Sequence, residues 1–317
     1  MAKTLKERII YSRLVRIVVA ILKRLVLPGF SGMSMYDVMR FFIGGLQEGA
    51  ITTRASSLAF NFFLAFFPSM IFLFTLIPYI PIDNFQQELF LLMQDVLPPS
   101  TYEATETTLN DIINNQHGSL LSIGVVLALY FSANGINSLI EAFNASAHQK
   151  ETRTLLKQRV VSLGLTVMIS LMILVAVSLI IFTQAFTAYM EGLGHLESYT
   201  ADILNISKWL ILLILLYFGI SVLFYWGPSG TAGKKQWRFF SPGSAMATVL
   251  TIITSLGFSY YVSNFAQYNK LYGSIGTLLV ILLWIYFNAI ILLLGFELNA
   301  SIVHAKISFT HRRKLKG

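Results

Sequence analysis

Long apolar stretches alternate with short polar connections along the whole chain. A membrane-spanning helix needs about 20 mostly apolar residues to cross roughly 30 Å of hydrocarbon. Six stretches reach that length, and their approximate limits are 55–80, 119–143, 160–186, 205–226, 242–263 and 275–303. The pattern therefore predicts an all-α fold, a polytopic membrane helical bundle with six transmembrane helices.

Two amphipathic segments precede the first span. Residues 8–28 mix lysine and arginine with isoleucine, leucine and valine at helical spacing, and the pattern stops at Pro28-Gly29. A second segment, about 36–53, leads into the first span. Basic amphipathic helices of this kind lie on membrane surfaces. We therefore expect residues 1–54 to be an interfacial segment.

The charges of the connections alternate between acidic and basic along the chain, except in the short 264–274 turn, which carries only Lys270. Segment 81–118 and the loop near 187–207 contain acidic residues and neither lysine nor arginine, whereas the loops near 144–159 and 227–241 and the tail 304–317 are basic. Because lysine and arginine concentrate on the cytoplasmic side of membrane proteins, both termini are expected in the cytoplasm. Segment 81–118 is expected on the opposite, extracytoplasmic side.

Composition agrees with a membrane protein and excludes several kinds of chemistry. The 317 residues are 55% hydrophobic and 12% charged, and their mean hydropathy is +0.67. The chain has no cysteine, and its five histidines have no metal-ligand spacing. The net charge of +8 lies in the connections rather than on a binding face. We expect no cofactor, no bound metal, no nucleic-acid partner and no enzymatic activity.

Polar residues at helical spacing occur in the second span, and others lie in the first and sixth spans. Polar groups in hydrocarbon are costly unless they face the bundle interior or water. The orientation places them at similar depth, so we expect a cavity open to the cytoplasm. Its candidate residues are Asn61, Asn134, Asn137, Glu141, Asn144, Glu297 and Asn299.

Two other interpretations of these polar residues stay open. The asparagines are interpreted first as interhelical hydrogen-bonding groups that hold the bundle together. A further interpretation places Glu141 and Glu297 at the interface beside Arg54 or Arg159. For Glu297 the functional and the packing interpretations have equal weight, because buried carboxylates in membranes often have a function.

Two further sets of residues are candidates for lipid contact and for packing. A basic rim would attract phosphate-bearing headgroups, or it would only set the topology. It consists of Arg54, Arg153, Arg159, Lys234, Lys235 and Arg238. The fifth span carries small residues at intervals of four, a spacing that favours close helix packing. These packing residues are Gly243, Ala247, Thr251 and Ser255.

Several motifs resemble the YihY/BrkB family of bacterial inner-membrane proteins, across about 40–305. They are Arg54-Ala55-Ser56-Ser57-Leu58-Ala59-Phe60, Phe67-Pro68, Tyr225-Trp226-Gly227-Pro228, Tyr272-Gly273-Ser274-Ile275-Gly276 and Gly295-Phe296-Glu297-Leu298-Asn299-Ala300. The chain departs from the family pattern at Asn61, where an aromatic residue is common. The resemblance implies six spans in the bacterial cytoplasmic membrane, without an established activity.

The resemblance also implies links to virulence and to the handling of lipid or lipopolysaccharide precursors. A ribonuclease BN label carried by some members is not supported here, because no clustered acidic residues or histidines form a catalytic set. The leading hypothesis is a transporter or flippase-like protein for an amphiphilic, lipid-related substrate. Its partners would be membrane lipids and a lipid or lipid-linked substrate. The alternative is a structural or assembly protein acting through helix contacts, and its oligomeric state is left open.

Overall fold

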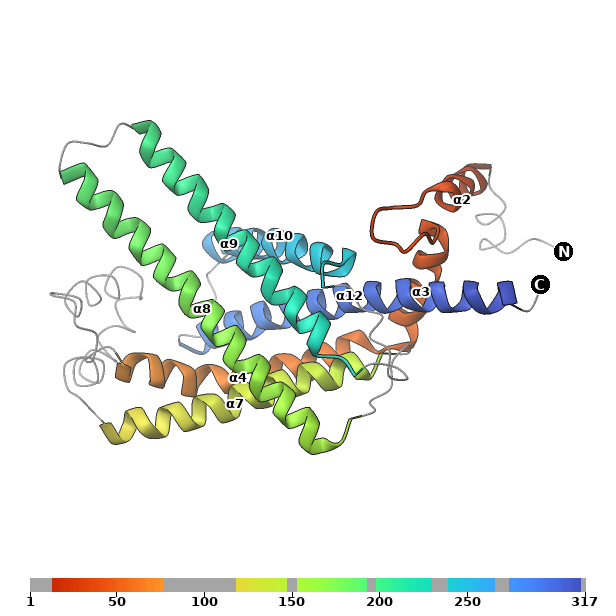
Figure 1. Cartoon of the computed structure of the whole chain (residues 1–317). Helices are drawn as coiled ribbons and strands as arrows, with labels where there is room; N and C mark the ends of the chain where they lie inside the picture. Colours follow the sequence, from red (N-terminus) through yellow and green to blue (C-terminus); the bar gives the residue numbers. More distant parts are fainter. Residues whose placement is uncertain are drawn as a thin grey trace.

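A computed structural model of the chain describes residues 13–76, 118–146, 153–192, 198–229, 239–265 and 274–314. The regular elements in these ranges are eight helices, so the predicted all-α fold is confirmed. The six long helices run back and forth, and two shorter ones lie at the end where the last helix finishes (Figure 1). We call this end the basic end of the bundle, because Arg54, Arg153 and Lys306 lie near it.

Two amphipathic helices occupy the basic end. Helix α2 comprises Arg13–Arg24 and exposes apolar side chains such as Ile21, which is 58% exposed. Helix α3 comprises Met35–Glu48, and the Ser34 hydroxyl caps it by accepting a hydrogen bond from the Asp37 amide at 3.2 Å. Membrane contact by α2 remains a prediction, and the first twelve residues of the expected interfacial segment lie outside the described ranges.

The chain bends sharply between α3 and α4 (Ile51–Leu76). The two helix axes meet at 66°, and Ala50 has a φ of 42°, a left-handed backbone conformation that side chains rarely adopt. A side chain at Gly49 would lie 2.5 Å from the Gly45 carbonyl oxygen and 2.7 Å from Arg54 Nη2. The bend therefore brings the start of α4 and Arg54 close against the end of α3.

Five single helices in the described ranges are long and apolar enough to cross a membrane. They are α7 (Gly118–Asn144), α8 (Leu155–Gly192), α9 (Ser198–Trp226), α10 (Pro242–Phe265) and α12 (Ser274–Lys314). The bent pair of α3 and α4 is a sixth candidate span. Segment 81–118, expected outside the membrane, lies beyond the described residues except for Gly118.

The packed core lies toward the basic end. Helix α4 packs along α7 and α12, α10 packs on α12 and α9, and α8 contacts α7 and α9. Phe143 on α7 stacks on Phe296 of α12 with ring centroids 4.3 Å apart, and Phe224 of α9 meets Phe143 edge-on at 5.5 Å. Helices α8 and α9 cross the others obliquely and extend away from them (Figure 1). Most side chains of α8 therefore face the surroundings rather than the core.

The last helix, α12, has 41 residues. At 1.5 Å per residue it is about 61 Å long, roughly twice the thickness of the hydrocarbon core. The part beyond the expected span packs on α3 through a small cluster that includes Val38, Ile302 and Ala305. No glycine or proline interrupts residues 296–314. The helix therefore continues through most of the basic tail, which began at residue 304 in our expectation.

Candidate functional site

A buried ion pair joins three helices near the basic end. Arg54 Nη2 on α4 lies 3.8 Å from Glu297 Oε2 on α12, and their side chains are 10% and 0% exposed. Arg54 Nη1 also donates to the Ala142 carbonyl oxygen near the end of α7, at 2.7 Å. Charges removed from water are tolerated when they are paired and hydrogen-bonded. Arg54 thus connects α4, α7 and α12 at one point.

The polar residues of α7 face α8. Asn137 Nδ2 donates to Glu141 Oε1 at 2.6 Å, and Gln158 Nε2 on α8 donates to Asn137 Oδ1 at 2.9 Å. Arg159, also on α8, donates to Asn134 Oδ1 at 2.5 Å. Asn137 is buried, whereas Glu141 and Arg159 are exposed. This row of side chains forms a hydrogen-bonded contact between two helices.

Two other asparagines fix helix ends. Asn144 Oδ1 accepts hydrogen bonds from the amide and the hydroxyl of Ser229, at 3.0 and 3.2 Å, just after α9. Asn299 Oδ1 on α12 accepts from the Gly243 amide at 2.9 Å, and its Nδ2 donates to Ser241 Oγ at 2.7 Å. Amides in the first turn of a helix lack partners within the helix. Asn299 therefore supplies a hydrogen-bond acceptor for an amide in the first turn of α10.

The structure distributes the seven candidate cavity residues over several separate contacts. Asn61 donates to the Ser57 carbonyl oxygen of its own helix at 3.0 Å. The other six belong to the ion pair, the α7–α8 row and the two helix-end contacts described above. None of the three cavities described among the placed residues is lined by any of the seven. Their role in a cavity remains a prediction.

The three described residues of the expected basic rim make different contacts. Arg54 is in the ion pair, and Arg159 is on the exposed face of α8. Arg153 Nη2 donates to the Gly227 carbonyl oxygen at 2.5 Å, at the end of α9. The remaining three lie outside the described residues, namely Lys234, Lys235 and Arg238.

The small residues of α10 lie partly against α12. A side chain at Gly243 would lie 2.1 Å from the Gly295 carbonyl oxygen, so the two backbones are in close contact. Ala247 is completely buried, whereas Thr251 and Ser255 are half-buried. Gly243 and Ala247 therefore pack against α12 within the same chain.

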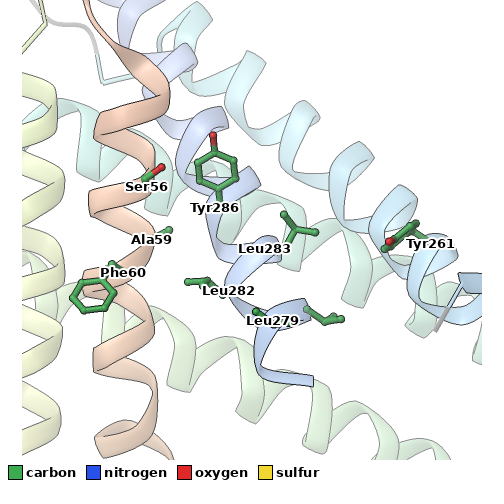
Figure 2. Close-up of a pocket in the computed structure, with 9 residues that line it drawn as sticks. Ser56, Ala59, Phe60, Tyr261, Leu279, Leu282, Leu283 and Tyr286 are labelled. Atoms are coloured by element: carbon green, nitrogen blue, oxygen red, sulfur yellow. The ribbon is translucent and has the colours of Figure 1, made fainter. Parts of the chain in front are cut away.

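An apolar cavity of about 600 Å³ lies between α4, α10 and α12 (Figure 2). One wall is α4, the opposite wall is α12, and Tyr261 of α10 lies at the far edge of the view. Hydroxyl groups come from one serine and two tyrosines. The lining residues are Ser56, Ala59, Phe60, Tyr261, Leu279, Val280, Leu282, Leu283 and Tyr286.

One face of α12 connects this cavity with the ion pair. Leu279, Leu283 and Tyr286 line the cavity, and Leu293 and Glu297 follow on the same helical face. Exposure falls along this face, from 46% at Leu279 and 39% at Leu283 to 1% at Leu293. The cavity thus lies where the contact of α12 with its neighbours is least complete.

Sequence reasoning did not identify this cavity. Its lining is made of apolar side chains within predicted spans, and a leucine that faces a cavity has the same hydropathy as one that faces lipid. One feature of the sequence could have indicated it: Leu279, Leu283 and Tyr286 lie on the same helical face as Glu297. Among the described residues, no group of three histidine, aspartate or glutamate side chains is arranged to hold a metal ion.

Comparison with known proteins finds relatives, several of which are named as membrane proteins. The chain is 31% identical over 255 residues to a ribonuclease-like protein, YfkH, of Bacillus subtilis, and the match covers 80% of this chain and 90% of that protein. It is 26% identical to a UPF0761 membrane protein of Stenotrophomonas maltophilia, over 83% of this chain and 60% of the relative. A Vibrio campbellii UPF0761 membrane protein is 24% identical, over 83% and 81%.

No solved structure matches the chain. The family whose profile matches is described as Virulence factor BrkB, and the match covers residues 42–316. This range includes the ion pair, the cavity and all the long helices. The relatives and the long apolar helices identify a membrane protein, and the chain belongs to the Virulence factor BrkB family.

Proposed function

We propose that this protein binds an amphiphilic, lipid-related substrate within the membrane and moves it, as a transporter or flippase-like protein. The observation that supports the proposal is the apolar cavity between α4, α10 and α12. Its volume, about 600 Å³, is in the usual range of roughly 300–1,000 Å³ for small-molecule sites. The hydrocarbon part of the substrate occupies this cavity.

The chemistry of the lining favours a hydrocarbon chain. Leucine, valine, alanine and phenylalanine supply most of the wall, and the Ser56 hydroxyl donates to a carbonyl of the preceding turn, that of Thr52, at 2.9 Å. An ion or a sugar would lose its hydration in such a cavity without gaining enough hydrogen bonds. The apolar part of an amphiphile gains by burial.

The positions of the cavity and of the ion pair on one face of α12 determine how the substrate is oriented in this proposal. Tyr286 and Glu297 are eleven residues apart, which is about 16 Å along a helix. The cavity therefore lies nearer the middle of the membrane than the Arg54–Glu297 pair. In this proposal the substrate's polar group points toward the basic end, and its chain points toward Leu279.

A pair of matched tryptophan substitutions tests whether the cavity is the binding site. Leu283→Trp fills the cavity, while Leu213→Trp adds the same bulk to α9, away from it; the two leucines are 39% and 41% exposed. Native mass spectrometry of protein extracted with native lipid should detect an amphiphile on the wild type and on Leu213→Trp. It should be lost from Leu283→Trp.

Movement is tested separately in liposomes. The probe is a phosphatidylglycerol with a fluorescent label on its acyl chain, and an impermeant quencher reports which leaflet contains it. The wild type and Leu213→Trp should accelerate exchange between leaflets, and Leu283→Trp should not. Retention of only bulk lipid by all three proteins, together with exchange equal to that of empty liposomes, would rule out the proposal.

An assembly role through α10 is the alternative, and the structure determines how it must be tested. Ala247 is buried against α12, so a bulky residue there would disrupt the chain's own packing. Ser255 is half-buried on the same helix and is the more informative position. Loss of a co-purifying protein in Ser255→Phe, with unchanged thermal stability, would favour assembly over transport.

A further inference from the structure

A second cavity lies between the start of α8 and the end of α9. It has a volume of about 500 Å³ and combines apolar side chains with one arginine, one serine and one tryptophan. Val161 and Met168 of α8 line it, together with Arg153 just before α8 and Trp226 at the end of α9. No residue of the first cavity contributes to it. We call it the α8–α9 cleft.

Arg153 is held in place at the polar edge of this cleft. Its Nη2 donates to the Gly227 carbonyl oxygen at 2.5 Å, and its Nη1 lies 3.5 Å from the Trp226 carbonyl oxygen. Carbonyl groups at a helix C-terminus often bind basic side chains in this way. The side chain is therefore preorganised, and its positive charge is fixed beside the cleft.

Gly164 leaves space in the cleft, because it has no side chain. Apart from the adjoining residues and the backbone of its own helix, no atom lies within 4 Å of the position that its Cβ would occupy, and the residue is exposed. Val161, Leu165 and Met168 line the same cleft with apolar side chains. The part of the cleft that α8 lines, from Val161 to Met168, therefore has no polar side chain and leads away from Arg153 toward the middle of the predicted span.

We propose that the α8–α9 cleft binds one anionic phospholipid from the leaflet on the side of the basic end. The phosphate lies beside Arg153, and one acyl chain lies over Gly164. Arginine binds phosphate with strong, charge-assisted hydrogen bonds, and tryptophan is favoured at the level of the headgroups. The lipid joins the start of α8 to the end of α9. This site is separate from the substrate cavity and does not depend on the proposed function.

The binding test uses two glycines that are alike in their surroundings. Gly164→Phe fills the cleft without touching other atoms at its Cβ, and Gly257→Phe places the same side chain on α10, where no atom lies within 4 Å either. Delipidated protein is titrated with dioleoylphosphatidylglycerol and followed by native mass spectrometry. The wild type and Gly257→Phe should each bind one more phosphatidylglycerol molecule tightly than Gly164→Phe does. Arg153→Gln should weaken that binding about tenfold.

Two further probes identify which part of the lipid is recognised. Dioleoylglycerol has the chains without the phosphate, and glycerol 3-phosphate has the phosphate without the chains. Neither should displace the bound phosphatidylglycerol. Displacement by glycerol 3-phosphate would assign the cleft to soluble phosphates and overturn the proposal. Equal lipid binding by wild type and Gly164→Phe would also overturn it.

Discussion

At the scale of single residues, the main feature of the interior is the buried Arg54–Glu297 ion pair. Glu297 is completely buried, and Arg54 is nearly so. One of the interpretations that the sequence left open was Glu297 beside Arg54, and the structure places the two side chains together. The sequence could not choose it, because the partners are 243 positions apart and pair only through the packing of α4 on α12.

Removing one member of this pair leaves the other charge buried. Arg54→Gln and Glu297→Gln should each lower the free energy of unfolding by about 3–5 kcal/mol. Unfolding by detergent titration in mixed micelles measures this loss. Arg159→Gln is the control, since Arg159 is exposed and its loss should cost within about 0.5 kcal/mol.

The double variant separates pairing from packing. If the two charges stabilise each other, Arg54→Gln with Glu297→Gln should lose clearly less than the sum of the single losses. Strictly additive losses would show that the two side chains act independently.

Asn299 gives a second prediction at this scale. Asn299→Ala removes the acceptor for the Gly243 amide and should cost about 1–3 kcal/mol, because a buried amide loses its partner. Asn288→Ala on the same helix removes only a bond to the Trp284 carbonyl of its own helix. Thermal unfolding in nanodiscs should show a lower Tm for the first variant alone. Equal Tm values would contradict the helix-end role of Asn299.

At the scale of elements, the sequence predicted where helices lie better than where they end. The apolar runs marked the spans, but α8 and α9 continue beyond the expected limits, since α8 is Leu155–Gly192 and α9 begins at Ser198. Hydropathy measures only the apolar part of a helix, and polar turns can extend it. The cavity between α4, α10 and α12 was not predictable, because it depends on the distance between helices.

Because α10 and α12 are in close contact, substitution of glycine by alanine should lower the stability at one position and raise it at another. A Cβ at Gly295 would lie 2.7 Å from the Gly243 carbonyl oxygen and 2.8 Å from the Ala247 Cβ. Gly295→Ala should therefore push the helices apart and cost about 1–3 kcal/mol. Gly257→Ala has open space and should stabilise α10 by up to about 1 kcal/mol. The difference in Tm between the variants measures this contrast, and a stabilised Gly295→Ala would refute the close contact.

At the scale of the whole molecule, the charges of the connections predict the orientation of the protein in the membrane. The chain contains no cysteine, so single cysteines can be introduced as unique labels. Thr154→Cys, exposed just before α8, should react with an impermeant maleimide only after cells are permeabilised. Glu103→Cys lies in the acidic segment 81–118 and should react in intact cells. These outcomes follow from the positive-inside rule.

Labelling of Thr154→Cys in intact cells would reverse the orientation. The proposed phospholipid would then come from the outer leaflet of the same membrane. A cysteine at Leu213, within α9, controls for membrane leakage, because a span interior should stay unlabelled in both conditions.

The length of α12 has a mechanical consequence. With no proline in its 41 residues, α12 is one continuous helix from the residues that line the cavity to those that pack on α3. If it pivots at Glu297, a tilt of roughly 10° would displace Lys314, the last residue of α12 and about 25 Å away, by about 4 Å. A change at the cavity that tilted α12 would therefore also move the end of this helix against α3.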